Sequence, residues 1–113
     1  METSSLLKDL NYNPDKPAIQ VLLQSNFTKE IRIAFEAGQV MKEHKTKFPI
    51  VVEIVEGAID FGVQGTVHHL QKGDLISLEG NVPHDLQAIE KSIVRLTLSI
   101  LDQTDRVKEV VSS

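Results

Sequence analysis

Apolar residues recur at every second position along several parts of the chain. This spacing is typical of β-strands that turn one face toward a core. It is present in segments 19–24, 31–36, 58–63 and 93–100. The last is the clearest case, because Val94, Leu96 and Leu98 share one face while Arg95 and Thr97 lie on the other. We therefore predict a half-buried strand in each of these segments.

Segment 50–55 has a different pattern, because both of its faces are nearly apolar. In an extended strand, Ile50 and Ile54 lie on one face, and Val51 and Val55 lie on the other. This predicts a strand that is buried on both sides, with one side toward the core and the other against a second sheet or a second copy of the chain. We therefore expect a homodimer, since a large apolar face marks an interaction surface.

Turn-forming residues separate the apolar segments. They are Ser25-Asn26, Ala37-Gly38, Glu56-Gly57, Gln64-Gly65, Lys72-Gly73-Asp74 and Gly80-Asn81-Val82-Pro83. Short strands with closely spaced turns predict an all-β protein, either an antiparallel sandwich or a barrel. Helix signals occur only near the ends of the chain, where we predict short helices over 4–10 and 102–111.

Length and composition narrow the classes of protein further. A chain of 113 residues is long enough for one core, so we predict a single domain over 1–113, with a barrel core at about 18–101 and flexible or helical ends at 1–17 and 102–113. The net charge is -4 and the basic residues are scattered, so we expect no nucleic-acid partner. The absence of cysteine excludes disulfides and thiolate metal sites. We find no signal peptide or membrane-spanning stretch, and therefore expect a cytoplasmic protein without a membrane partner.

Two segments carry a motif that narrows the fold. In the first, Gly38 is followed by five residues and then by His44, and the stretch closes at Gly57. The second begins at Gly73-Asp74 and reaches Pro83-His84. Both motifs, in this order and within an all-β pattern, resemble the cupin family over about residues 18–101. The resemblance implies a jelly-roll barrel, or double-stranded β-helix, with an internal pocket.

The face that each side chain takes on its strand predicts which residues line this pocket. His44 and Thr46 are two positions apart, as are His84 and Leu86, so each pair would share a face. Ile50 stands at a position that the resemblance to cupins places in the pocket. We therefore predict a pocket lined by His44, Thr46, Ile50, His84 and Leu86, in which the imidazoles lie among apolar neighbours.

The motif departs from the cupin pattern at two of the four usual metal ligands. Thr46 stands at the position of the second histidine, and Ile50 stands at the position of the glutamate. His44 and His84 remain candidate ligands for one divalent transition metal, such as Fe, Zn, Mn or Ni, although catalytic sites usually have three protein ligands. His68 shares the parity of Leu70, and we expect a packed core histidine there rather than a third ligand.

These features leave three functions open. The first is a small cupin that binds a small molecule in the barrel pocket without full metal-dependent catalysis, and this is the function that we favour. The second is a metal-dependent enzyme of the dioxygenase or isomerase type that uses His44 and His84. The third is a structural or partner-binding module with a vestigial pocket. No residue is assigned a catalytic role, because a fold alone does not imply a function.

Overall fold

The computed structural model describes residues 1–101, and this part of the chain contains strands but no helix. The nine strands are β1 (Ala18–Gln24), β2 (Thr28–Phe35), β3 (Val40–His44), β4 (Ile50–Glu56), β5 (Ala58–Val63), β6 (Thr66–Gln71), β7 (Leu75–Leu78), β8 (His84–Ala88) and β9 (Ser92–Ser99). The strands predicted from alternation are therefore confirmed as β1, β2, β5 and β9, and the apolar segment 50–55 is β4. Within residues 1–101 no helix could span a membrane.

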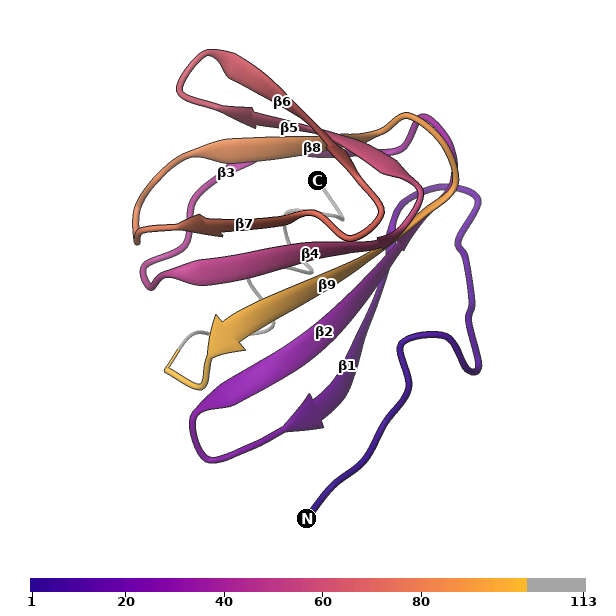
Figure 1. Cartoon of the computed structure of the whole chain (residues 1–113), viewed down its shortest axis with the longest axis vertical. Helices are drawn as coiled ribbons and strands as arrows, with labels where there is room; N and C mark the ends of the chain where they lie inside the picture. Colours follow the sequence, from indigo (N-terminus) through magenta and orange to yellow (C-terminus); the bar gives the residue numbers. More distant parts are fainter. Residues whose placement is uncertain (102–113) are drawn as a thin grey trace.

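The strands form two antiparallel sheets that face each other (Figure 1). The five-stranded sheet has the order β1-β2-β9-β4-β7, and the four-stranded sheet has the order β3-β8-β5-β6. Every second residue of β9 faces the interior, and Val94, Leu96 and Leu98 are at most 7% exposed. Ile59 and Phe61 of β5 close the core from the opposite sheet. Alternation thus places the apolar residues of both sheets in one core.

β4 is not buried on both sides within the chain. Its inward residues Ile50, Val52 and Ile54 belong to the core, but Val51 on the outer face is 40% exposed. On the same outer face, Glu53 forms an ion pair with Arg95, with 2.9 Å between Oε1 and Nη2. The expected burial of both faces is therefore wrong for the single chain, and its completion by a second copy stays a prediction.

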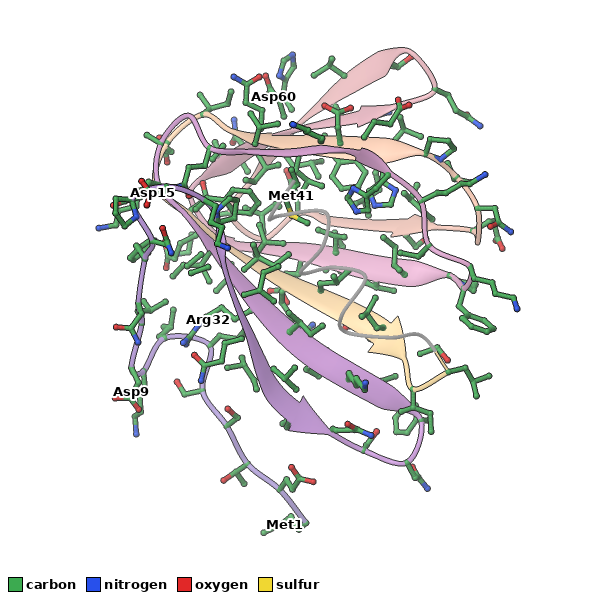
Figure 2. All side chains as sticks on the ribbon, turned by 180° about the vertical axis from the view of Figure 1, so that it is seen from behind. Met1, Asp9, Asp15, Arg32, Met41 and Asp60 are labelled. Atoms are coloured by element: carbon green, nitrogen blue, oxygen red, sulfur yellow. The ribbon has the colours of Figure 1, made fainter. Side chains whose placement is uncertain are left out.

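The N-terminal segment forms turns instead of the helix predicted over 4–10. The guanidinium of Arg32, on the outer face of β2, is buried beneath this segment (Figure 2). Its acceptors are the carbonyl oxygens of Ser5, Leu6, Lys8 and Asp9 and the side-chain oxygen of Gln20. Because these carbonyl oxygens accept hydrogen bonds from Arg32, they do not accept them from the N–H groups of a helix. In addition, the φ of Asp9 is +54°, a left-handed backbone conformation that a right-handed helix does not contain. The helix predicted over 102–111 lies outside the described residues.

Gly38, Gly57 and Gly73 have φ of +86°, +89° and +91°, and all three lie in turns that the turn-forming residues predicted. Gly57 is also crowded, because a Cβ atom there would collide with the Ser92 hydroxyl and the Lys91 carbonyl. Both the positive φ and the lack of space for a Cβ atom therefore require glycine between β4 and β5.

Candidate functional site

The two motif histidines meet at one end of the barrel. His44 is the last residue of β3 and His84 is the first residue of β8, and the antiparallel register pairs them directly. Their ring centroids are 4.4 Å apart, and their planes are tilted by 58°. On its other side, the His84 ring stacks on Phe61 with a centroid distance of 5.5 Å. One strand pair thus brings together two histidines that are far apart in the sequence.

A β-bulge in β3 brings a third side chain into the same region. Met41 pairs with Leu86 and His44 pairs with His84, so β3 has one more residue than β8 between these pairs. The extra residue allows both Met41 and His44 to face the interior although they are three positions apart. Met41 is 1% exposed and lies between the two sheets (Figure 2). Strict alternation places Met41 and His44 on opposite faces, and this is why the sequence analysis missed Met41.

Backbone carbonyls hold both imidazoles through the same ring atom. The Nδ1 atom of His44 lies 2.8 Å from the carbonyl oxygen of Lys42, and Nδ1 of His84 lies 2.9 Å from that of Val82. A carbonyl oxygen only accepts hydrogen bonds, so Nδ1 carries the proton in each ring. In the neutral ring Nε2 is then the atom with the lone pair, which is the usual arrangement for a histidine that binds a ligand or a metal.

The surroundings of His84 favour its neutral form. Burial lowers the pKa of His84 below 6.5, because desolvation disfavours the charged ring, and the nearby His44 lowers it further. The hydrogen bond to the Val82 carbonyl and the charge of Asp85 act in the opposite direction and do not cancel the effect of burial. At neutral pH, His84 therefore offers an acceptor nitrogen to the interior rather than a positive charge.

The five residues predicted to line the pocket all border one cavity of about 20 Å³. The cavity is lined by Ile33, Met41, His44, Thr46, Ile50, Val52, His84, Leu86, Val94 and Leu96. Its polar groups are the two imidazoles and the Thr46 hydroxyl, and the rest of the lining is apolar. A cavity of this size has room for about one water molecule or one small ion. Its use as a binding site stays a prediction.

Two loops contact each other at the end of the barrel where the histidines lie, and we call residues 45–49 and 79–83 the mouth loops. The amide of Asn81 donates to the carbonyl oxygen of Thr46, with 2.6 Å between the two atoms. A side chain at Gly80 would collide with the carbonyl of Lys47, so the loops pack with their backbones in contact. The Thr46 hydroxyl donates to the Phe48 carbonyl at 2.8 Å. Thr46 thus belongs to the contact between the mouth loops as well as to the cavity lining.

An open hollow of about 520 Å³ lies at the same end of the barrel. It is bordered by the beginnings of β2 and β4 and by the ends of β7 and β9, including Phe27, Pro49 and Glu79. Ile50 lines both this hollow and the small cavity. The small cavity beside the histidines and the larger open hollow are therefore neighbours, and Ile50 borders both.

The expectation of a packed core histidine at position 68 is wrong. His68 pairs with Phe61 in register but is exposed, because it lies on β6, the edge strand of the four-stranded sheet. The tip of the β5–β6 hairpin projects away from the other strands (Figure 1). His69 is also exposed, and its Nδ1 lies 2.6 Å from Oδ1 of Asp60. Neither histidine lines the cavity.

The donor set of the cavity does not fit a catalytic divalent metal. Among residues 1–101, no group of three or more His, Cys, Asp or Glu side chains converges. Thr46 offers only a neutral hydroxyl, and Ile50 offers no donor atom. Catalytic metal sites usually combine three protein ligands, and these often include a carboxylate. We therefore derive no reaction step through a divalent ion here.

Solved structures define the fold as that of a cupin. An RmlC-like cupin protein from Desulfovibrio desulfuricans is 20% identical, with a TM-score of 0.80 over 88% of this chain and 96% of that chain. A structure from Thermus thermophilus is 23% identical, with a TM-score of 0.78 and coverage of 88% and 98%. A cupin superfamily protein from Desulfitobacterium hafniense is 13% identical, with a TM-score of 0.74 and coverage of 80% and 84%. At these identities, the likeness shows the fold alone.

A family profile is more specific than the fold. The AraC-like ligand binding domain matches residues 29–103, which is more than half of the chain. The chain therefore belongs to the family of AraC-like ligand-binding domains, and the small cupin inferred from its motifs is confirmed. The match runs from β2 through β9 and so includes both histidines. No protein with a curated function matches the chain.

Proposed function

We propose that this protein binds a small molecule at the barrel end beside His44 and His84, without full metal-dependent catalysis. The observation that carries the proposal is the pair of imidazoles, 4.4 Å apart, in a cavity whose lining is otherwise mostly apolar. An apolar space with a few convergent polar groups is the usual form of a small-molecule site. Membership in a family of ligand-binding domains supports the same function.

The chemistry of the imidazoles indicates which part of a ligand would bind there. Since each Nδ1 donates to a carbonyl oxygen, the acceptor atom of either ring in its neutral form is Nε2. A hydroxyl group could donate a hydrogen bond to one of these nitrogens, and an amino group could donate to both. The cavity of about 20 Å³ admits only one such small group. The larger part of the ligand would then occupy the hollow beyond Ile50.

The metal-dependent enzyme is the second candidate, and the Nδ1 hydrogen bonds favour it. They fix His44 and His84 as metal-binding histidines are usually fixed, with the outward nitrogen held by a carbonyl. Against it stands the donor set, in which Thr46 and Ile50 replace two ligands. A dioxygenase or isomerase reaction therefore needs stoichiometric divalent metal on these two histidines alone, and this can be measured by elemental analysis.

A matched pair of probes tests the proposed function. We would record the imidazole ¹⁵N resonances of the full chain in EDTA while adding cyclohexanol or its methyl ether. The alcohol can donate a hydrogen bond and the ether cannot, so only the alcohol should shift the Nε2 resonance of His84. His84→Ala should abolish the binding of cyclohexanol, and the exposed control His69→Ala should leave it unchanged. Equal responses to both probes, or no response to cyclohexanol, would contradict the proposal.

A further inference from the structure

A hollow of about 180 Å³ lies between the N-terminal segment and the outer face of the five-stranded sheet. Its lining combines apolar side chains, hydroxyl groups and one charge of each sign, and consists of Ser4, Ser5, Leu6, Leu22, Leu23, Glu30 and Arg95. A cavity of about 150 Å³ can hold a benzene molecule, so this hollow has room for a small organic ligand. Neither His44 nor His84 borders it, so it is a different site from the barrel end.

The guanidinium of Arg95 has donors that the chain does not use. Its Nη2 lies 2.9 Å from Oε1 of Glu53, but its Nε is buried and has no hydrogen-bond partner among the residues that the structure describes. Arg32 is the register partner of Arg95, and its own acceptors are neutral oxygen atoms. A buried donor without an acceptor is costly, and like charges on paired residues repel each other. This side of the hollow therefore favours an anionic acceptor such as a carboxylate.

Glu30 gives the hollow a negative charge close to this cationic side. It lies diagonally across from Arg95 on the same face, because its partner in the register is Thr97. Its carboxylate accepts hydrogen bonds from the hydroxyl groups of Thr28 and Thr97, and none of the ion pairs within residues 1–101 includes it. A carboxylate has about four acceptor positions, so Glu30 can accept further hydrogen bonds. It therefore favours a cationic donor such as an ammonium group.

We propose that this hollow binds a small aliphatic amino acid in its zwitterionic form. The carboxylate of the ligand accepts hydrogen bonds from Arg95, its ammonium group donates to Glu30, and its side chain packs against the three leucines. The zwitterion brings no net charge and complements both residues. A simple carboxylate is repelled by Glu30, and a simple amine is repelled by Arg95. This inference is independent of the function proposed for the barrel end, because the two sites share no residue.

Titration of the full chain with L-valine and two analogues tests the proposal. Isovalerate lacks the ammonium group of L-valine, and isobutylamine lacks its carboxylate. Calorimetry at pH 7 should show one L-valine per chain and an affinity for each analogue that is at least about tenfold weaker. In NMR spectra, L-valine should shift the amide signals of residues 4–6, 22 and 23 and leave the imidazole of His84 unchanged. An analogue that binds as tightly as L-valine, shifts confined to the barrel end, or no saturable binding of L-valine would overturn the proposal.

Substitution of the charged residues assigns the two ends of the ligand. Glu30→Gln keeps the size of the side chain but removes its charge, so it should weaken L-valine binding by about tenfold and strengthen isovalerate binding. Arg95→Gln should abolish the binding of L-valine. Glu53→Gln is the matched control, because it breaks the ion pair with Arg95 but leaves the guanidinium beside the hollow. A Glu30→Gln variant that binds L-valine like the parent would refute the proposal, even if Arg95→Gln fails to fold.

Discussion

At the scale of single residues, the protonation of His84 follows from its position. The ring is 3% exposed and is enclosed by Phe61, Leu86 and the partner imidazole of His44. Such surroundings cannot solvate a charge, so the folded protein holds the ring neutral at a pH at which an unfolded chain would protonate it. This difference links the stability of the fold to pH.

We predict that the protein loses stability as pH falls from about 7.5 to about 5.5. The pKa of His84 is lowered in the folded state, so its contribution is fully present above pH 6.5 and is lost as pH falls toward the folded-state pKa. Urea unfolding at both pH values measures the effect. His84→Gln should flatten the dependence, while the exposed control His68→Gln should leave it unchanged. An unaltered slope in His84→Gln would contradict the argument.

Gly57 and Gly38 offer a second comparison of single residues. Both have positive φ, but only Gly57 is crowded, while a Cβ at Gly38 meets nothing within 4 Å. We expect Gly57→Ala to lower the free energy of unfolding by about 1–3 kcal/mol more than Gly38→Ala does. Chemical denaturation of the two variants measures this difference. Equal losses would mean that the collision with Ser92 and Lys91 is relieved by a small backbone shift.

At the scale of elements, alternation along the chain was sufficient to predict the strands with regular pairing. β2, β5 and β9 have one apolar face each, and this pattern determines which face is buried. The jelly-roll fold and the two histidines were predicted from the resemblance of the two motifs to cupins, and not from alternation. The bulge at Met41 could not be predicted. The extra residue in β3 changes which side chains share a face, but the sequence of apolar and polar residues does not reveal it. Exposure of His68 was also unpredictable, since it depends on β6 being an edge strand.

The N-terminal segment shows how a distant residue overrides a local signal. Ser4 and Ser5 resemble helix caps, but Arg32 binds four backbone carbonyls of this segment, and the result is a set of turns. A buried guanidinium with five donors requires such a set of acceptors. The competition between these interactions is not visible in residues 4–10 taken alone.

Arg32→Lys tests whether this network holds the N-terminal segment. Lysine keeps the charge but lacks the planar fork, so we expect a loss of about 2–3 kcal/mol in the free energy of unfolding. Hydrogen exchange should accelerate in the amides of residues 5–9 before it does in the strands. Lys8→Ala is the matched control, because Lys8 contributes only its backbone carbonyl to Arg32. A similar loss in both variants would rule out a special role for the guanidinium.

At the scale of the whole molecule, the outer face of the five-stranded sheet has one part that the N-terminal segment covers and another part that is exposed. The N-terminal segment covers Arg32 on β2, whereas Val51 on β4 and Leu75 on β7 are 40% and 64% exposed. The uncovered half corresponds to the apolar outer face that first suggested a homodimer. An apolar face at this position is suited to a second copy of the same face, related by a twofold axis.

We predict that Val51→Lys shifts the protein toward the monomer, because it places a charge on the face that would be buried between two copies. Light scattering after size-exclusion chromatography measures the molar mass at several concentrations. Val67→Lys is the control, since Val67 is 54% exposed but lies on β6 of the other sheet. A wild-type monomer at every concentration, or equal dissociation in both variants, would exclude this dimer.

The contact between the mouth loops also determines how quickly the site can exchange its contents. The hydrogen bond from the Asn81 amide to the Thr46 carbonyl has to break before anything can pass between these loops to His44 and His84. Local opening of this kind is slower than diffusional encounter, so the opening frequency would limit the rate of entry. Tight and weak occupants entering by this route would then arrive at similar rates and differ mainly in residence time.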